Sequence, residues 1–283
     1  LNIAVGGGTG TGKSYLAGLM CEQLIDLGYA SVICDPEGDH IGLGELRHVL
    51  VTGGEERRLA DPAEVVRLLR NASVVIDLSH LDAAAQADYL AGLPAEIEAQ
   101  RALSGLPQWV VVDEAHAPFG RAGTSLAVFN PATKGYLLIT WRPEQFASEV
   151  PAALDAVIAL ASPEPSDHLV DLTAAVADMP RAQVAQLLKG PTGRAVLAWR
   201  GQTHQTVAIT PGARRTPHPR HAHKDAHRGV EHSRDHEPER GLRVEMPAPE
   251  REHLRKADGK LRGRGALPVD VGVEEREKLL LID

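Results

Sequence analysis

Short apolar runs alternate with longer segments of helical periodicity over the first 210 residues of the chain. These runs have the length and the β-branched content of strands. They are Asn2–Val5, Ser31–Cys34, His48–Val51, Ser73–Leu78, Trp109–Val112, Tyr136–Thr140, Ala156–Leu160, Ala195–Trp199 and Thr206–Ile209. The pattern predicts an α/β fold, a mostly parallel sheet with helices on both faces. The last two strands, separated by RGQTHQ, predict an antiparallel hairpin added to the sheet.

Three of the helical segments carry recognisable ends. The first runs from Lys13 to about Leu27 and is followed by Gly28, a residue type that commonly stops a helix. A second begins at Asp61-Pro62, a capping residue followed by proline at the first helical position, and a third fills Asp82–Ala102. Five apolar residues fall on one face of the first helix: Leu16, Leu19, Met20, Leu24 and Leu27.

Composition supports this class of fold. Hydrophobic residues make up 43% of the 283 positions and aromatic residues only 4%, so the core is expected to consist mainly of Ala, Val, Leu and Ile. The sequence has no apolar run long enough for a membrane span and no secretory leader. Cys21 and Cys34 are not spaced as a metal or redox pair, which predicts buried free thiols in a cytoplasmic protein. Because the chain starts at Leu1 without methionine, we expect that something upstream has been removed or lies outside this fragment.

The chain changes character after residue 210. Residues 211–283 are poor in apolar positions and contain 16 Lys and Arg against 14 Asp and Glu, whereas residues 1–210 contain 14 against 24. We therefore divide the chain into a domain, 1–210, and a His- and Arg-rich tail, 211–283, that is expected to be disordered. An acidic body is a poor general surface for nucleic acid, so a DNA partner would need a basic groove or channel.

The segment IAVGGGTGTGKS, residues 3–14, matches the pattern of a phosphate-binding loop between a strand and a helix. Glycines allow backbone N–H groups to point at an anion, and the helix N-terminus adds a favourable dipole. Lys13 is expected to reach the β- and γ-phosphates, and the Ser14 hydroxyl to bind Mg²⁺. The predicted nucleotide-binding residues are Gly7, Gly8, Thr9, Gly10, Thr11, Gly12, Lys13, Ser14 and Tyr15.

Two carboxylates follow the strand Trp109–Val112 in the segment WVVVDEAH. Asp113 is expected at the carboxyl edge of the sheet, where it would hold Mg²⁺ together with Ser14. Glu114 is the candidate general base, which would deprotonate the attacking water. The alternative interpretation is an acidic strand end that only faces solvent.

Two further strand ends carry polar residues. The strand ending at Thr140 continues into Trp141-Arg142-Pro143, and Thr140 or Arg142 is a candidate sensor of the γ-phosphate. Alternatively, Thr140 caps the next turn and Arg142 pairs with a surface acid. In VICDPEGDH, residues 32–40, three carboxylates line either the site, a subunit boundary or a tight turn. They are Asp35, Glu37 and Asp39.

Taken together, the segments GGGTGTGKS, VICDPEGDH, VVVDEAH and LLITWRP resemble the HerA/FtsK class of P-loop ATPases. The resemblance covers residues 1 to about 210. It implies a RecA-like core that binds ATP and Mg²⁺ and hydrolyses ATP, often in a hexameric ring that moves DNA. A phosphotransferase acting on a small molecule, and an interaction module that binds ATP with little turnover, remain alternatives.

The sequence departs from the pattern of this class at the sensor strand. The class commonly has T-Q-R-P, whereas Trp141 replaces the glutamine here. An indole has one donor and no acceptor, so it cannot orient water as an amide does, which puts efficient hydrolysis in question. No arginine finger is assigned, and the candidates are Arg142, Arg181, Arg194 and Arg200.

The letters DEAH at residues 113–116 also name a class of helicases. Those enzymes need a second RecA-like domain, and the roughly 95 residues between Asp113 and the change of composition leave no room for one. Seven of the 13 histidines lie in the tail, where no packed scaffold would enforce the geometry of a metal site. They are His218, His221, His223, His227, His232, His236 and His253.

Overall fold

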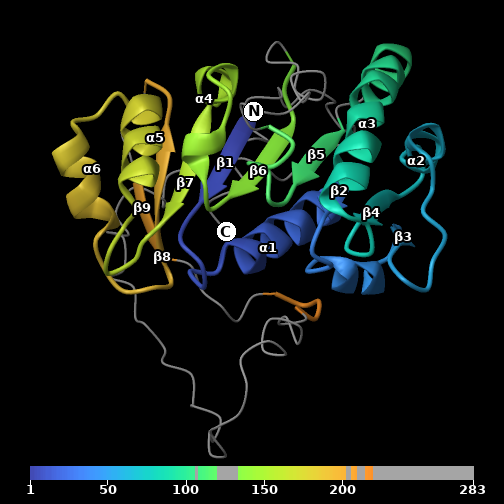
Figure 1. Cartoon of the computed structure of the whole chain (residues 1–283), viewed down its shortest axis with the longest axis horizontal. Coiled ribbons are helices and arrows are strands. Elements are labelled where there is room, and N and C mark those ends of the chain that lie inside the picture. Colours follow the sequence, from blue (N-terminus) through green and yellow to red (C-terminus); the bar gives the residue numbers. More distant parts are fainter. Residues whose placement is uncertain (106–107, 120–132, 202–204, 209–213, 219–283) are drawn as a thin grey trace, which may run out of the picture. The chain divides into compact units, whose positions relative to one another are not determined.

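A mostly parallel sheet runs through the part of the chain that the computed structural model describes, residues 1–105, 108–119, 133–201, 205–208 and 214–218 (Figure 1). Within these residues the sheet has nine strands in the order β3-β4-β2-β5-β6-β1-β7-β8-β9. Their bounds are β1 Asn2–Gly6, β2 Ser31–Asp35, β3 Val49–Gly53, β4 Ser73–Asp77, β5 Trp109–Val112, β6 Tyr136–Thr140, β7 Ala156–Leu160, β8 Arg194–Trp199 and β9 Gln205–Ala208. All nine predicted strands are present. Three have the predicted bounds, and the ends of the others differ by at most two residues. Ile209, the predicted last residue of β9, lies outside the described residues.

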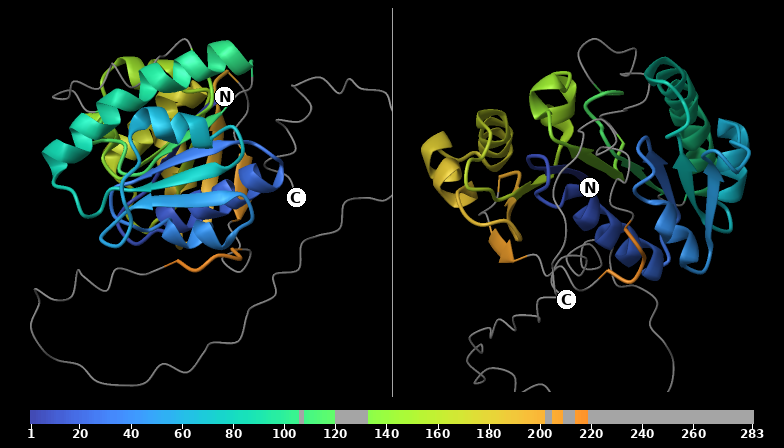
Figure 2. Two further views of the ribbon diagram at one scale, coloured as in Figure 1. Left: turned by 90° about the vertical axis from the view of Figure 1, so that its right-hand side faces the viewer. Right: turned by 60° about the horizontal axis from the view of Figure 1, so that its bottom comes forward.

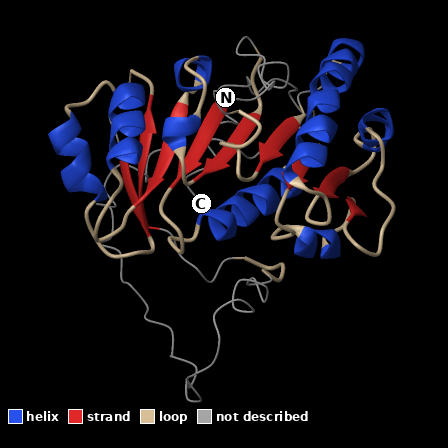
Figure 3. Cartoon of the chain, viewed as in Figure 1, coloured by secondary structure: helices blue, strands red, loops and turns tan. Residues whose placement is uncertain are grey.

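The direction of the strands agrees with the prediction. Strands β1 to β7 pair in parallel, whereas β8 pairs antiparallel with both β7 and β9. The hairpin expected from RGQTHQ is therefore confirmed. Figure 3 shows the sheet and the helices that connect its strands.

The helices include three that were predicted and others that were not. Their bounds are α1 Lys13–Asp26, α2 Pro62–Leu68, α3 Ala83–Ser104, α4 Glu149–Ala153, α5 Asp167–Ala177 and α6 Arg181–Leu188, with 3-10 turns η1 Ile41–Glu45 and η3 Pro143–Gln145. The predicted starts of α2 and α3 are correct, because Asp61 and Asp82 each accept a hydrogen bond from the backbone N–H three residues later. Helices α4, α5 and α6 were not predicted.

Helix α1 and the helix α3 cover opposite faces of the sheet. α1 connects β1 to β2 and α3 connects β4 to β5, so the two connections run in opposite directions along the sheet. Since crossovers between parallel strands are right-handed, this places the two helices on opposite sides. Figure 2 shows the arrangement, with η1 on the side of α1.

The buried face of α1 differs from the face suggested by its leucines. Ala17, Cys21 and Leu24 are buried, whereas Leu27 is 55% exposed. Leu16, Leu19 and Met20 are only half-buried. Alanine and cysteine have small side chains, which allow the helix to pack closely on the sheet. The positions of the large apolar residues therefore did not identify the face of α1 that packs on the sheet.

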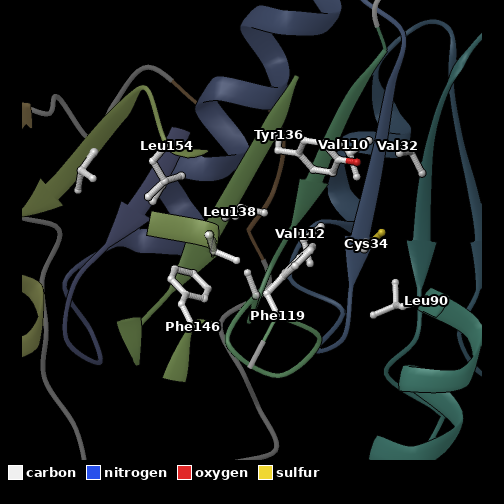
Figure 4. Close-up of a cluster of buried hydrophobic side chains, with 14 of the residues drawn as sticks. Val32, Cys34, Leu90, Val110, Val112, Phe119, Tyr136, Leu138, Phe146 and Leu154 are labelled. Carbon is white, nitrogen blue, oxygen red and sulfur yellow. The ribbon is translucent and has the colours of Figure 1, made fainter. Parts of the chain in front are cut away.

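The core on the other face contains apolar side chains from the sheet and from the helices α2 to α6. Figure 4 shows Cys34 of β2, Val110 and Val112 of β5 and Tyr136 of β6 gathered with residues of other elements. An apolar pocket lies among these side chains and Leu90, Leu93 and Ile97 of α3. Its lining includes none of the predicted nucleotide-binding residues, so it is part of the core.

The order of the central strands determines what meets at the sheet edge. β6, which ends at the candidate sensor Thr140, lies between β1 and β5. In the register, Gly6 pairs with Thr140 and Val112 with Leu138. Because parallel strands present their carboxyl ends at one edge, the phosphate loop, Thr140 and Asp113 all follow strands at that edge.

Contacts between residues group Leu1–Ala222 into one compact unit, which extends beyond the boundary at 210 drawn from composition. A second unit, His223–Asp283, lies outside the described residues. In the described part of the chain, no helix has the length and apolar character needed to cross a membrane.

Candidate functional site

The phosphate loop has the backbone of an anion-binding turn. Gly10 and Gly12 adopt φ angles of 77° and 98°, in the left-handed region that favours glycine. Gly7 is equally required, because a Cβ atom there would lie 2.5 Å from Thr11 Oγ1 and 2.9 Å from Leu160 Cβ. The loop around Gly8 and Gly10 is exposed, so its backbone is accessible to a ligand.

The side chains of the loop fold back onto it. Lys13, which is only 9% exposed, donates a hydrogen bond from Nζ to the carbonyl of Gly8 at 2.9 Å. Thr11 Oγ1 donates to the same carbonyl at 2.8 Å. Ser14 and Tyr15 follow in the first turn of α1, where both are half-buried. The ammonium group is thus positioned over the loop, where a phosphate would need it.

Asp113 lies at the end of β5, continuing the pairing of the strand with β2. Its backbone N–H donates to the carbonyl of Cys34 at 3.1 Å. The side chain is 4% exposed, and the backbone N–H of Glu114 donates to its Oδ1 at 2.8 Å. The predicted metal-binding carboxylate is therefore held at the sheet edge in a fixed orientation.

His40 is the partner of Asp113 that the sequence analysis missed. It is fully buried, and its Nε2 lies 2.9 Å from Asp113 Oδ2. Burial alone would lower the pKa of His40, but the hydrogen bond to Asp113 and the charges of Asp35 and Asp113 outweigh it and raise this pKa. An ionised Asp113 carboxylate can only accept, so His40 Nε2–H donates to Asp113 Oδ2, and this oxygen carries a charge-assisted hydrogen bond.

The electrostatics of Asp113 favour its ionised form. Burial would raise its pKa, but the hydrogen bond and charge of His40, the backbone N–H of Glu114 and the charge of Lys13 together lower it. The charge of Lys13, which belongs to the phosphate loop, is therefore one of the influences that lower the pKa of Asp113. An anionic oxygen donor beside a lysine is the environment that a Mg²⁺–phosphate group requires.

The loop that carries His40 is shaped by Asp35. This buried carboxylate accepts hydrogen bonds from the backbone N–H groups of Gly38 at 2.8 Å, Asp39 at 3.0 Å and His40 at 2.8 Å. Burial raises the pKa of Asp35 to about 6. Asp35 therefore builds the turn and presents His40, while Glu37 is exposed and the Asp39 side chain is buried.

Glu114 adopts an uncommon backbone conformation. Its φ of 49° lies in the left-handed region, which costs a residue with a Cβ atom about 1 to 2 kcal/mol. The next residue, Ala115, returns to the sheet by donating its N–H to the carbonyl of Ile139 at 2.8 Å. Such conformations persist where the surrounding structure enforces them, often at functional sites.

His116 connects Glu114 with the end of β6. Its Nδ1 lies 3.3 Å from Glu114 Oε2 and 3.3 Å from Thr140 Oγ1. Burial, and then the charge of Arg142, lower the pKa of His116, so the ring is neutral at neutral pH. The candidate base and the candidate sensor therefore share one imidazole, a contact that the sequence analysis did not foresee.

The residues after Thr140 form a stack at the rim of this cluster. Arg142 donates its backbone N–H to Thr140 Oγ1 at 2.9 Å, so Thr140 does cap the following turn. The Arg142 guanidinium carbon lies 3.8 Å from the centroid of the Trp141 ring, and the ring of His116 meets the indole edge-on at 5.6 Å. Trp141 is 36% exposed. The indole thus contacts both the Arg142 guanidinium and the His116 ring while remaining partly exposed.

Two of the other arginine candidates, Arg181 and Arg200, have local partners in the described structure. Arg181 pairs with Asp167 and Asp171 on the surface. Arg200 donates to the backbone carbonyls of Leu154 and Pro151. These contacts give both side chains a structural role, and they do not identify either one as an arginine finger.

The donor set suits magnesium better than a closed metal cage. Within the described residues, no group of three or more His, Cys, Asp or Glu side chains could hold a metal. Magnesium in phosphate sites usually takes one or two protein carboxylates and completes its shell with phosphate and water oxygens. The Ser14 hydroxyl and the anionic Asp113 fit that requirement.

Fold, loop and sheet-edge carboxylate together define a P-loop NTPase fold of the RecA-like type. Within this class, residues 2–109 match the family model described as "Helicase HerA, central domain". The matched segment contains the phosphate loop and the DPEGDH turn and stops before Asp113. The resemblance to the HerA/FtsK class stated from the sequence is confirmed over this segment.

Solved structures of other proteins have a similar fold. The genome packaging NTPase B204 from Sulfolobus turreted icosahedral virus 2, in complex with ATP-gammaS, is similar with a TM-score of 0.53 and 16% identity, over 73% of this chain and 96% of that one. VirB4 of Thermoanaerobacter pseudethanolicus is similar with a TM-score of 0.52 and 13% identity, over 74% and 89%. The plasmid coupling protein TrwB, in complex with ADP and Mg²⁺, is similar with a TM-score of 0.51 and 11% identity, over 74% and 85%. No curated protein matches the chain.

Proposed function

We propose that residues 1–210 bind Mg²⁺–ATP and hydrolyse it as the core of a HerA/FtsK-like motor that acts on DNA. The observation that carries the proposal is the strand order β5-β6-β1, which gathers three functional elements at one sheet edge. These elements are the phosphate loop, the Asp113-Glu114 pair and Thr140. The relatives of this fold in complex with ATP-gammaS and with ADP and Mg²⁺ support ATP as the ligand.

In the proposed complex, the backbone N–H groups of Gly7 to Gly12 point at the phosphates and Lys13 neutralises the β- and γ-phosphate oxygens. Ser14 and Asp113 would hold Mg²⁺, with Asp113 oriented by His40. The ion, when bound, neutralises charge that develops on the phosphate oxygens. The chain itself supplies positioning, which is the main requirement for phosphoryl transfer.

Glu114 is the proposed general base. Its carboxylate takes a proton from water as the water oxygen attacks the γ-phosphorus and the bond to the β-phosphate oxygen breaks, giving ADP and phosphate. The contacts of His116 with Glu114 and Thr140 support a role for this neutral ring in holding both groups near the attacking water. A conformation that costs free energy at Glu114 is consistent with selection for the position of its side chain.

DNA is the proposed substrate of the motor, and a ring of copies is the proposed assembly. The genome packaging function in the name of B204 and the plasmid coupling function in the name of TrwB support DNA as the cargo. The acidic balance of residues 1–210 restricts any DNA contact to a local basic surface, as a ring channel would provide. Two buried free cysteines support action in the cytoplasm.

A second candidate function is an interaction module that binds ATP and turns it over slowly. The stack of Arg142 on Trp141 favours it, because the guanidinium is engaged beside the position where the class commonly has a glutamine. In such a module, ATP would drive assembly and its hydrolysis would be slow.

Phosphate release with and without double-stranded DNA, together with the mass of the assembly with and without ATP, tests these functions. Release stimulated by DNA, together with ATP-dependent assembly, supports the motor. Assembly without release supports the interaction module. ATP consumption that requires an added metabolite would identify a phosphotransferase, and a monomer that does not bind ATP would contradict the proposal.

A further inference from the structure

A short segment near the end of the first unit packs against the helix that begins at the phosphate loop. Arg214–His218, which we call the strap, lies beside α1 and η1 (Figures 1 and 2). Composition had placed this segment in the tail. Its hydrogen bonds to side chains of α1 join residues that are 189 to 194 positions apart in the sequence.

The strap converges on one buried carboxylate, Glu22 of α1, which is 3% exposed. The backbone N–H of Thr216 donates to Glu22 Oε1 at 2.8 Å, and the Thr216 hydroxyl donates to the same oxygen at 2.7 Å. The backbone N–H of Arg215 lies 3.1 Å from both carboxylate oxygens, and its guanidinium Nε 3.7 Å from Oε2. A buried carboxylate is unfavourable unless it is paired, so Glu22 is built to receive the strap.

The opposite side of the strap contacts the loop after β2. His218 Nδ1 lies 3.4 Å from the carbonyl of Asp39. A Cβ atom on Gly42 would lie 2.1 Å from the carbonyl oxygen of Pro217. On the α1 side, a Cβ atom on Gly18 would lie 2.5 Å from Arg214 Nη1. Two glycines thus leave the space that the strap fills between α1 and this loop.

The two elements joined by the strap carry the two sides of the proposed magnesium site. α1 carries Ser14 in its first turn, and the loop after β2 carries His40, whose ring holds Asp113. The strap also reaches the first turn of α1, where the Arg214 guanidinium carbon lies 5.8 Å from the centroid of the Tyr15 ring and the ring of His218 lies 6.1 Å from it. A change in the strap would therefore alter the spacing of the magnesium ligands.

We propose that Glu22 and the strap are positioning residues of the magnesium half of the site, fixing α1 against the loop that orients Asp113. This inference rests on the proposed function. It implies that the strap tunes how strongly Mg²⁺ enhances nucleotide binding, and that it acts through Ser14 and Asp113 without touching the nucleotide.

The test uses the full chain and a fluorescent ATP analogue, titrated in EDTA and at a series of Mg²⁺ concentrations. Glu22→Gln removes the charge, and Thr216→Val removes the hydroxyl with little change of shape. Hydrogen bonds to charged groups contribute enough that each variant is expected to raise the Mg²⁺ concentration for half-maximal enhancement by about tenfold. Affinity in EDTA should stay at the wild-type value.

Three controls separate positioning from a general loss of structure. Thr216→Ser keeps the hydroxyl and should restore the wild-type Mg²⁺ dependence; Glu45→Gln alters an exposed carboxylate of η1 and should change nothing. Hydrogen exchange at the Thr216 amide should be slow in the wild type and fast in Glu22→Gln. If Glu22→Gln does not fold, the pair of Thr216 variants decides.

Two results would overturn the inference. One is an equal loss of affinity in EDTA and in Mg²⁺, which would mean that the strap only stabilises the fold. The other is an unchanged Mg²⁺ dependence in both variants. In either case the wild type still binds Mg²⁺–ATP, so the proposed function stands; a wild type that binds no nucleotide contradicts the proposed function itself.

Discussion

The two halves of the candidate site are built in different ways. The phosphate loop is made by residues 6 to 14, and its hydrogen bonds join atoms within that segment, as in the contact of Lys13 with Gly8. The half around Asp113 is made by side chains from distant segments. His40 meets Asp113 across 73 residues, and His116 meets Thr140 across 24.

A site made of backbone groups is encoded locally in the sequence, whereas a site made of side chains from several strands depends on the packing of the whole sheet. Glycines and a helix N-terminus form the first half wherever the strand–loop–helix unit folds. The second half exists only when β2, β5 and β6 lie side by side in register. Substitutions in the two halves should therefore affect different measurements.

The largest effect is expected from Glu114→Gln, which alters the second half without removing a side chain. If Glu114 is the general base, the turnover number should fall by about 100- to 10,000-fold while ATP affinity stays unchanged. Phosphate release and ATP titration measure the two quantities. Glu164→Gln, at an exposed position, is the matched control. Equal turnover in Glu114→Gln and wild type would remove the base assignment.

His40→Leu should reveal the dependence of the second half on packing. It leaves the Asp113 carboxylate buried without its partner, which costs about 3 to 5 kcal/mol of unfolding free energy. Urea denaturation measures this loss. His168→Leu, on the exposed face of α5, should change stability by less than about 0.5 kcal/mol. A similar result for both variants would show that the His40–Asp113 contact contributes little.

Lys13→Ala should affect the first half alone. Loss of a charged donor to the phosphates should weaken ATP binding by about 10- to 100-fold, with unfolding free energy close to the wild-type value. Isothermal titration and thermal denaturation measure the two properties, and Lys189→Ala serves as the exposed control. Wild-type affinity in Lys13→Ala would contradict the assignment of the phosphate loop.

Trp141→Gln tests whether the rim of the second half limits turnover. An amide can both donate to and accept from water, so turnover should rise by about fivefold, the equivalent of one hydrogen bond. Trp141→Phe keeps a ring for Arg142 to stack on and should leave turnover unchanged. Turnover that does not increase in Trp141→Gln would show that hydrolysis is not limited at this position.

The smallest effect is expected at the two buried cysteines, Cys21 of α1 and Cys34 of β2. Burial raises the pKa of Cys21 and of Cys34 to about 12, so both thiols are protonated at pH 8. The native protein should show no reaction with a thiol reagent, and both groups should react after unfolding in urea. Rapid labelling of either cysteine in the native state would contradict the packing of α1 or β2.

These contrasts also explain which features could be predicted from the sequence. The nine strands and the phosphate loop are local patterns, and the structure contains all of them. Helices α5 and α6 were not predicted. The sequence between β7 and β8 nevertheless contains a helix start, because Ser166 caps α5 by accepting a hydrogen bond from the Leu169 N–H. His40 could have been suspected from its place at the end of the DPEGDH turn.

The contact of Glu22 with the strap had a weaker signal. A glutamate on the same helical face as Gly18 is an unusual choice for a buried position, and it indicates a partner. The partner itself could not be named, because the segment RRTPH has the same polar, basic composition as the tail sequence around it. Short polar segments that pack through their backbone carry no hydrophobic periodicity.

The left-handed conformation of Glu114 has a consequence for the evolution of this chain. Glycine is the residue that best tolerates its φ of 49°, so replacement of Glu114 by glycine would relieve backbone strain and remove the carboxylate in one change. If Glu114 is the general base, as we propose, stability and turnover oppose each other at this position. Lineages that lose the need for hydrolysis are expected to drift toward glycine at this position, which makes residue 114 a marker for distinguishing motors from their inactive descendants.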